Sequence, residues 1–307
     1  MCRILAYLGE PLSLDGPLFA ADNSLVRQSV SPRLMSLLNI GGFGLVAWEA
    51  ASREPERPYT YWTPNVPVFD RNLKSLAEKV HVTSAIAHVR GVIYDAGQNI
   101  GPQNLHPFRF GDARVVLAQN GALHRFAEMR HDLLEVIRPD FALSIEGTTD
   151  AEWIYAAVLS RLDDPLGAVT SRELADATEA TVKTIGELRD RHGIHTHSPV
   201  NLVLGDGNTL IAVRFCFDYG WYRADQSFFD VEREFDFTSL WFTLGKRFAP
   251  GEDGWDIRFD QGLGAAFIAS EPLGKDTTAW LEVPEYSMAV LTGDDSGVSI
   301  DVRELAR

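Results

Sequence analysis

Cysteine is scarce in this sequence, and long hydrophobic runs are missing. Cys2 and Cys216 are the only two cysteines among 307 residues, so no disulfide framework is available to hold the fold. No apolar run approaches the roughly 18–20 residues that a membrane-spanning helix needs. The apolar stretch at residues 4–8 is also too short for the hydrophobic region of a signal peptide. We therefore expect a cytoplasmic protein that has no disulfides and does not enter a membrane.

Positive charge is also in short supply. The chain carries 43 Asp and Glu against 28 Lys and Arg, which leaves a formal net charge of −15 at pH 7. Nucleic-acid phosphates and anionic membrane surfaces repel such a chain. We therefore expect no nucleic-acid partner and no membrane partner.

No standard metal or phosphate motif is present. Three histidines lie within residues 192–197, but their spacing matches no standard zinc site and no cysteine or carboxylate cluster accompanies them. The glycine-rich stretch at residues 39–44 lacks the Lys-Ser/Thr ending of a phosphate-binding loop. We expect neither a metal nor a cofactor.

Predicted strands lie towards both ends of the sequence, and predicted helices collect in the middle. Apolar runs predict strands at residues 3–8, 45–49, 83–89 and 114–118. Later runs predict a hairpin through Asp206-Gly207 and three closing strands, at 265–269, 287–291 and 298–302. This order suggests an α+β layered fold and not a repeated βαβ unit. Because no clear linker divides the chain, we treat residues 1–307 as a single domain.

Two candidate capping boxes mark helix starts in the middle of the chain. In residues 149–152 (Thr-Asp-Ala-Glu) and 170–173 (Thr-Ser-Arg-Glu), a hydroxyl and a carboxylate three residues apart would satisfy free amides of the first turn. Helical spacing predicts a further helix over residues 72–80. Residues 51–67 contain four prolines and are predicted to form an irregular loop.

Aromatic side chains concentrate in residues 215–259, which hold 14 of them together with many acids. The simpler interpretation is a run of amphipathic strands with packed rings. The alternative is a wall of a substrate pocket or a subunit interface, and a homo-oligomer is left open.

The position of Cys2 carries the first functional signal. If the initiator methionine is removed, Cys2 carries a thiol and a free α-amine on the same carbon. A thiol attacks as the thiolate, and its ordinary pKa of about 8.5 leaves only a few per cent ionised at pH 7. The α-amine has a pKa of about 7.7–8.0, so it is partly neutral at pH 7 and able to accept that proton. A histidine base is then not required.

Three further segments suit recognition of a glutamine-like substrate. Arg90 ends a predicted strand, and its guanidinium matches an α-carboxylate. Asn120 and Gly121 end another strand, where an amide side chain and a backbone N–H would stabilise an oxyanion. Asp150 follows Gly-Thr-Thr and offers a carboxylate to an α-ammonium. Each also has a structural interpretation, namely an ion-pair arginine, a turn dipeptide and an acid at a helix N-terminus.

The segments MCR, AHVR, QNG and TTDAE occur in an order and spacing that resembles the class II glutamine amidotransferases. These are N-terminal nucleophile (Ntn) hydrolases, and the resemblance implies an α+β four-layer αββα sandwich with the cysteine at the edge of two stacked sheets. The stretches NSLVRQSVSPR, GFGLVAW, NLHPF, SPVNLVLGDGNTLIAVR and IASEPL are similar to the stand-alone branch, which includes the ergothioneine-pathway γ-glutamyl hydrolase. The likeness covers most of the chain except about 215–260.

The resemblance implies a role for each candidate residue. Cys2 would be the nucleophile, with its own amine as the general base. Asn120 and Gly121 would form the oxyanion hole. Arg90 would bind the substrate α-carboxylate, and Asp150 would hold its α-ammonium.

Three positions depart from the family pattern. Gly41 stands where the family often has an acid, Ile93 where it usually has threonine, and Gln119 where it often has histidine. These differences point to an altered γ-glutamyl substrate or to lost activity. His88 and His106 are interpreted as packing groups and not as catalysts.

The predicted reaction is hydrolysis of the γ-amide of glutamine, or of a γ-glutamyl compound, through a Cys2 thioester. It would release glutamate and ammonia or an amine. The partner would be a small-molecule substrate, and ammonia would pass to an ammonia-accepting protein unless a larger γ-glutamyl compound is the substrate. The alternative is a catalytically silent relative that keeps the fold for binding or scaffolding.

Overall fold

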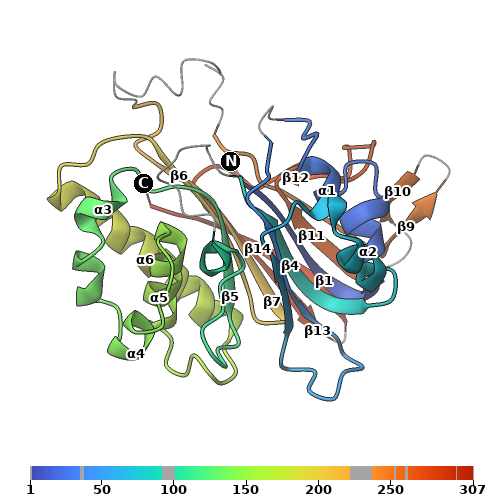
Figure 1. Ribbon diagram of the computed structural model, residues 1–307, viewed down its shortest axis with the longest axis horizontal. Helices are drawn as coiled ribbons and strands as arrows, with labels where there is room; N and C mark the ends of the chain where they lie inside the picture. The colour runs from blue at the N-terminus through green and yellow to red at the C-terminus, as the bar shows by residue number, and fades with distance from the viewer. Residues whose placement is uncertain are drawn as a thin grey trace.

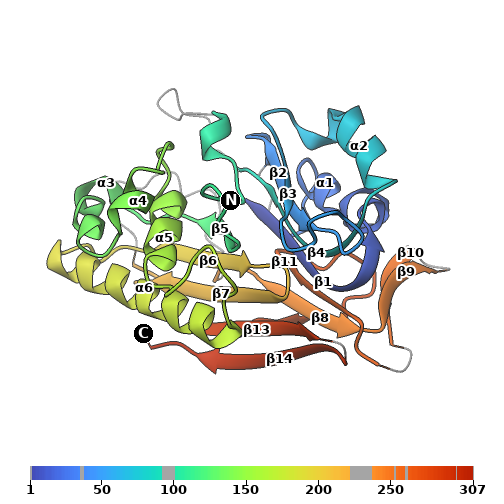
Figure 2. The ribbon, with the colours of Figure 1, turned by 90° about the horizontal axis from the view of Figure 1, so that it is seen from below.

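The computed structural model describes residues 2–34, 38–91, 101–221, 237–251, 254–259, 262–294 and 296–306. Within these ranges, two β-sheets are stacked against each other, and helices cover their outer faces (Figures 1 and 2). The order of layers is therefore helix, sheet, sheet, helix, as the resemblance implies.

The larger sheet contains seven described strands, and the first strand of the chain lies near its centre. In spatial order the strands are β12 (Leu281–Glu282), β8 (Trp241–Gly245), β11 (Ala265–Ala269), β1 (Arg3–Ser13), β4 (His81–Val89), β2 (Phe43–Trp48) and β3 (Tyr59–Thr63). Strands β1 and β4 are antiparallel, with Arg3 opposite Val89. Central pairing on both sides of β1 therefore holds the backbone next to Cys2 at the end of this sheet.

The smaller sheet has five described strands. In spatial order they are β14 (Gly297–Glu304), β13 (Ser287–Asp294), β7 (Thr209–Phe217), β6 (Ser198–Gly205) and β5 (Val116–Gly121). The predicted hairpin is confirmed as β6–β7, and Asp206 accepts hydrogen bonds from the amides of Asn208 and Thr209 at 3.0 and 2.8 Å. Strands β9 (Arg247–Gly251) and β10 (Gly254–Arg258) form a separate ribbon.

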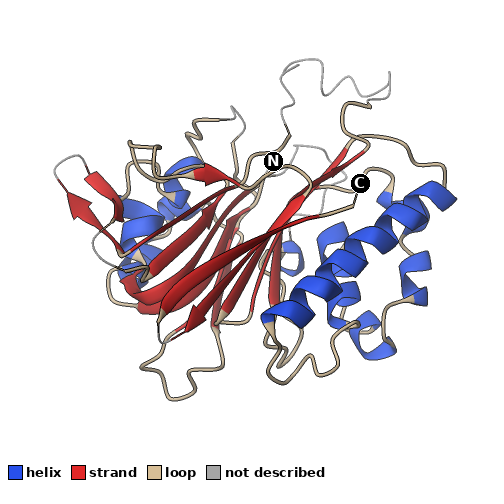
Figure 3. Cartoon of the chain, turned by 180° about the vertical axis from the view of Figure 1, so that it is seen from behind, coloured by secondary structure: helices blue, strands red, loops and turns tan. Residues whose placement is uncertain are grey.

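Short helices cover the larger sheet, and a second group that includes the two longest helices, α5 and α6, covers the smaller sheet (Figure 1). The first group is η1 (Gly16–Ala20), α1 (Leu25–Gln28), η2 (Pro67–Phe69) and α2 (Arg71–Ala77). The second is α3 (Phe126–Met129), η4 (Asp132–Glu135), α4 (Pro139–Ala142), α5 (Asp150–Leu159) and α6 (Ser171–Arg191), and the short η3 (Pro102–Asn104) precedes β5. Figure 3 shows α6 lying along the outside of the smaller sheet. No helix in the described part of the chain is long and apolar enough to cross a membrane.

Three apolar clusters fill the spaces between the four layers, and side-chain alternation assigns each strand residue to one of them. On β1, Ile4, Ala6 and Leu8 belong to the cluster between the two sheets. Leu5 and Tyr7 belong to the cluster under the short helices. The third cluster lies between the smaller sheet and helices α5 and α6. Because successive side chains of a strand point to opposite faces, this alternation also predicts which face of the sheet each polar residue at a strand end occupies.

The two predicted capping boxes behave differently. Thr170 accepts a hydrogen bond from the amide of Glu173 at 3.1 Å and starts α6, as predicted. Thr149 likewise precedes α5, so the predicted helix start is confirmed, but the capping box is not formed there, because the Thr149 side chain makes no capping bond. The Glu152 carboxylate instead accepts from the amides of residues 146 and 147 at 2.9 and 2.7 Å. This carboxylate therefore orders the turn before Asp150 and not the first turn of α5.

Residues 51–67 were predicted to be an irregular loop, and this is wrong for their second half. Strand β3 occupies Tyr59–Thr63 and pairs with β2. It lies at the edge of the larger sheet, where proline at either end of a strand removes no interior ladder bond. The predicted helix at 72–80 is confirmed as α2, with Asp70 as its N-cap.

Candidate active site

The predicted site residues lie where the two stacked sheets meet at the start of β1. Cys2, His88 and Asn120 follow the inter-sheet face of β1, β4 and β5, because each is two positions away from a member of the inter-sheet cluster. Those cluster members are Ile4, Ile86 and Ala118. The start of the chain lies beside β5 and between the sheets in both Figures 1 and 2. The fold therefore directs a thiol from one sheet and an amide from the other into the same interlayer.

The Cys2 thiol contacts the backbone that follows β4. The amide of Gly91 donates to Sγ at 3.4 Å, and Sγ lies 3.7 Å from the Gly91 carbonyl oxygen. Cys2 remains partly exposed. The sulfur therefore lies directly beside the residue that follows Arg90.

Arg90 is held by the glycine-rich turn before β2. The Arg90 amide donates to the Gly42 carbonyl, and the Arg90 carbonyl accepts from the Gly41 amide, both at 2.9 Å. Gly42 has φ +110°, and a Cβ there would come within 2.9 Å of the Thr63 carbonyl oxygen, so a side chain is not tolerated. Burial lowers the pKa of Arg90, and the nearby Cys2 sulfur opposes this shift. Because arginine stays protonated in proteins, Arg90 is a buried cation next to the thiol.

Asn120 and Gly121 end β5 and are not a turn dipeptide. They pair with Asn201 and Val200 of β6. Asn120 is buried, and its Oδ1 has no hydrogen-bond partner among the described residues. Gly121 has φ +145°, and a Cβ at this position would overlap the Pro199 carbonyl oxygen. Glycine is therefore required here by both the backbone conformation and the approach of β6.

Asp150 lies at the N-terminus of α5 and contacts the chain on either side of Asn120 and Gly121. Its Oδ2 accepts from the Leu123 amide at 2.6 Å and from the Gln119 side chain at 3.2 Å. Burial raises the pKa of the Asp150 carboxyl, and these hydrogen bonds oppose the shift. Gln119, one of the departures from the family pattern, is therefore a direct partner of the predicted ammonium-binding acid.

Two neutral histidines join the sheets next to this site. His88 donates from Nε2 to the Gln119 carbonyl at 3.1 Å, and the Gln119 amide donates to Nδ1 of His106 at 3.2 Å. The two rings pack with centroids 4.3 Å apart. Burial lowers the pKa of His88 to about 3 and that of His106 well below its usual value. Both are neutral at pH 7, so they serve as the packing groups that the sequence indicates.

A buried ion pair behind Cys2 was not foreseen from the sequence. Arg3 donates from Nη1 to the Cys2 carbonyl at 3.0 Å. Its Nε lies 3.2 Å from Oε1 of Glu271, and the two side chains are 2% and 1% exposed. The sequence did contain a signal for the importance of Arg3 and Glu271, because both residues fall in stretches that carry the family resemblance, MCR and IASEPL.

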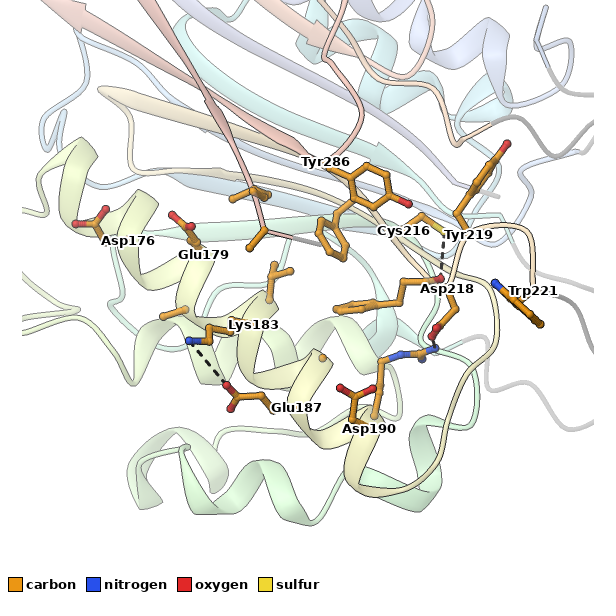
Figure 4. Close-up of a pocket in the computed structure, with 18 residues that line it drawn as sticks. Asp176, Glu179, Lys183, Glu187, Asp190, Cys216, Asp218, Tyr219, Trp221 and Tyr286 are labelled. Atoms are coloured by element: carbon orange, nitrogen blue, oxygen red, sulfur yellow. Dashed lines mark hydrogen bonds and ion pairs between the residues drawn. The ribbon is translucent and has the colours of Figure 1, made fainter.

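A cavity of about 770 Å³ lies away from these residues, between α6 and the smaller sheet. Figure 4 shows that Cys216, Tyr219 and Tyr286 border it, together with acidic side chains of α6. Cys216 is 1% exposed, and burial raises its pKa to about 12. The thiol in the cavity is therefore protonated at pH 7, which agrees with the prediction that Cys216 is a small buried hydrophobe.

The three histidines of residues 192–197 contact different partners. His192 lies 2.7 Å from Asp132, whereas His195 lies 3.8 Å from Asp218. His197 packs against Cys216, with Nδ1 at 3.6 Å from the sulfur. Among the described residues no group of three metal-ligating side chains is found.

The aromatic-rich segment is described only in part. Its described strands pack rings into the core, as the simpler interpretation predicts, with Phe248 and Phe267 centroids 5.0 Å apart. Residues 222–236 of this segment lie outside the described residues, and so does Ile93.

Comparison with known protein families gives one match and two curated relatives. The model of the class II glutamine amidotransferases matches residues 46–218. The chain is 27% identical over 312 residues to the "Probable glutamine amidotransferase DUG3" of Saccharomyces cerevisiae, which covers 95% of this chain and 82% of the relative. It is 26% identical over 215 residues to the gamma-glutamyl-hercynylcysteine sulfoxide hydrolase of Mycolicibacterium smegmatis, which covers 69% and 78%.

Solved structures share the fold. A glutamine aminotransferase class-II domain protein from Silicibacter pomeroyi aligns with a TM-score of 0.59 and 19% identity, covering 100% of both chains. The glutamine phosphoribosylpyrophosphate amidotransferase of B. subtilis aligns with a TM-score of 0.51 and 15% identity, covering 98% of this chain and 49% of that one. These likenesses confirm the predicted Ntn-hydrolase fold.

Proposed function

The chain belongs to the class II glutamine amidotransferases, and from this premise we propose that it hydrolyses the γ-amide of glutamine or of a γ-glutamyl compound through a thioester on Cys2. The products are glutamate and ammonia or an amine. Two observations support this proposal: the Cys2 thiol lies beside Gly91, which follows Arg90, and His88 bonds to the carbonyl of Gln119, which precedes Asn120 and Gly121.

The proposed reaction begins once Met1 is removed. The α-amine of Cys2 takes the thiol proton, and the thiolate attacks the γ-carbonyl carbon. The Asn120 side-chain amide and the Gly121 N–H stabilise the oxyanion of the tetrahedral intermediate. The leaving nitrogen takes a proton from the α-ammonium and departs, and water then hydrolyses the thioester to glutamate and the free thiol.

Two charged groups are proposed to hold the amino-acid end of the substrate. Arg90 is a buried cation whose fork suits a bidentate carboxylate. Asp150 is a carboxylate at the N-terminus of α5 that accepts from the Leu123 and Ala151 amides and from the Gln119 side chain, and a carboxylate is the group that attracts an ammonium. These roles follow from the family resemblance and are supported by the positions of both groups beside the proposed nucleophile and oxyanion hole.

The size of the substrate is the open part of this proposal, and the relatives represent both choices. One is named as a glutamine amidotransferase and the other as a hydrolase of a larger γ-glutamyl compound. Gly41 and Gln119 stand beside Arg90 and Asp150 respectively, so these two departures from the family pattern lie next to the proposed substrate-binding groups. A γ-glutamyl substrate that differs from glutamine is consistent with this placement. If glutamine itself is the substrate, an ammonia-accepting protein is the proposed partner that would use the released ammonia.

Glutamate release by the purified protein tests the reaction. L-glutamine is measured beside a panel of γ-glutamyl amides and γ-glutamyl thioether conjugates, and intact mass establishes whether Met1 is absent. Cys2→Ala is the variant expected to abolish release, and Cys216→Ala is its matched control. Release from glutamine alone supports a glutaminase, whereas release only from a larger conjugate supports a γ-glutamyl hydrolase. No release from any substrate by protein that lacks Met1 would favour the catalytically silent alternative.

A further inference from the structure

Arg3 turns its side chain back onto the residue that precedes it. Nη1 donates to the Cys2 carbonyl at 3.0 Å, while Nε is paired with Glu271 at 3.2 Å. Strand alternation places Arg3 on the opposite face from Cys2, with Leu5 and the outer cluster. The guanidinium therefore reaches the Cys2 backbone from behind, without entering the space in front of the thiol.

Glu271 is fixed by groups other than Arg3. Its Oε2 accepts from the Arg33 amide at 2.8 Å and from the Asn23 side chain at 3.2 Å, and Oε1 accepts from the Leu34 amide at 3.2 Å. The neighbouring Ser270 also bonds to β1 through the Ile4 amide at 2.9 Å. The carboxylate is consequently a rigid anchor that joins the end of β11 to the loop before residue 34.

We propose that Arg3 is a positioning residue for Cys2, and that the Arg3–Glu271 pair holds the thiol and the α-amine in the orientation that attack requires. This inference rests on the proposed function, because it assigns a role within that reaction. It also gives a purpose to two stretches, NSLVRQSVSPR and IASEPL, that the proposed reaction does not otherwise use.

The physical need for such a device comes from the position of Cys2. The first residues of a chain fray unless they are tied down. Cys2 precedes β1, whose ladder begins at Arg3. A bond to the Cys2 carbonyl fixes rotation about its Cα–C bond, and this rotation sets the directions of both the amine and the thiol. Because the bond is charge-assisted and partly buried, it is stronger than a neutral, solvent-exposed one.

Only arginine fits this arrangement. Its planar fork places Nε against the Glu271 carboxylate as an ion pair and directs Nη1 as a donor to the Cys2 carbonyl. Lysine would carry the same charge but is a point donor on a flexible stem, so it would not hold both partners in fixed directions. Arg3→Lys therefore removes the positioning while it keeps the charge beside Glu271.

The test measures the reactivity of the Cys2 thiol directly. In a Cys216→Ala background, the rate of alkylation by iodoacetamide is followed by intact mass across pH 6–10, and glutamate release is followed in parallel. Arg189→Lys is the matched control, because Arg189 is a buried arginine paired with Asp218 at 2.8 Å, on the far side of the smaller sheet. Intact mass also verifies removal of Met1 in every variant.

We expect Arg3→Lys to lower the rate of Cys2 alkylation at pH 7 by about threefold or more. We expect kcat to fall about 10²-fold with KM changed less than about threefold, the usual cost of misplacing a reacting group by about 1 Å. Arg189→Lys should leave the alkylation profile unchanged. If Arg3→Lys does not fold, Glu271→Gln, which keeps the volume and removes the anchoring charge, is judged by the same criteria.

The inference is overturned if Arg3→Lys keeps the wild-type alkylation profile and kcat, or if Arg189→Lys shifts the profile equally. If the wild-type protein releases no glutamate but the profiles still separate the two variants, the proposed reaction is wrong and the positioning of Cys2 by Arg3 stands.

Discussion

The two cysteines of this protein occupy opposite environments. Cys2 is partly exposed at the end of the larger sheet, with the guanidinium groups of Arg3 and Arg90 near it. Cys216 is buried in β7, the middle strand of the smaller sheet, beside a large cavity, and its pKa is raised to about 12. A thiol becomes a nucleophile where cations favour the thiolate, not where a cavity is large. Reactivity is therefore expected at Cys2 and not at Cys216.

The largest effect should come from exchanging the two thiols for alanine one at a time. Cys2→Ala is expected to lower kcat for glutamate release at least about 10³-fold, because it removes the nucleophile. Cys216→Ala should keep kcat within about twofold. Steady-state assays on proteins with matching circular dichroism spectra provide the measurement. Equal losses in both variants would contradict the assignment of Cys2.

Two asparagines in register on neighbouring strands sharpen the same comparison. Asn120 of β5 lies opposite Asn201 of β6. Asn120→Ala should lower kcat about 10²–10³-fold, the usual effect of losing one oxyanion donor. Asn201 donates to the Thr238 carbonyl at 2.9 Å, so Asn201→Ala should cost about 1–3 kcal/mol of unfolding free energy with little change in kcat. Denaturant titration and kinetics separate the two, and a larger kcat loss at Asn201 would count against the oxyanion role of Asn120.

Two buried arginines, one near each cysteine, provide a third test. Arg90→Lys should lower kcat/KM about 10–100-fold, mainly through KM, because a lysine cannot bind a carboxylate bidentately. Arg189 bonds to Asp218 and Ser198 beside the Cys216 cavity, and Arg189→Lys should leave KM unchanged. The measurement is KM for the best substrate of the panel. An unchanged KM in Arg90→Lys would exclude Arg90 as the carboxylate ligand.

The smallest effect concerns the pH dependence of stability. The Cys216 pKa in the folded state is about 12 and therefore above its unfolded value. The contribution of the protonated Cys216 thiol to the free energy of unfolding is complete below about pH 8.5. It is lost as pH rises towards 12, at about 1.4 kcal/mol per pH unit, because the thiol ionises in the unfolded chain and not in the folded one. Between pH 8 and pH 10, wild-type protein should lose about 1–2 kcal/mol more unfolding free energy than Cys216→Ala. Parallel pH curves would show that Cys216 is not shielded from ionisation.

Local chemistry in the sequence predicted much of the secondary structure. The hairpin at Asp206-Gly207, the cap at Thr170 and the strand at residues 265–269 are all found where they were expected. The hairpin and the cap depend on interactions among residues close in the chain, and the strand is marked by a short apolar run, so each signal is complete within a short window. The error at β3 has the opposite origin, because an edge strand is stabilised by its neighbour β2. At Thr149 the helix start is correct, but the Glu152 carboxylate bonds to the turn before the helix and does not complete a capping box.

The sequence by itself determined the alternation that places Cys2, His88 and Asn120 on inter-sheet faces, and the motifs that identify the family. Only the tertiary structure decided that Arg3 and Glu271, 268 positions apart, form a buried pair behind Cys2. It also decided that His88 and His106 remain neutral, because burial between two stacked sheets sets their pKa values. Periodicity is a property of neighbours along the chain, whereas ion pairing and desolvation depend on which distant segments the packed sheets bring together.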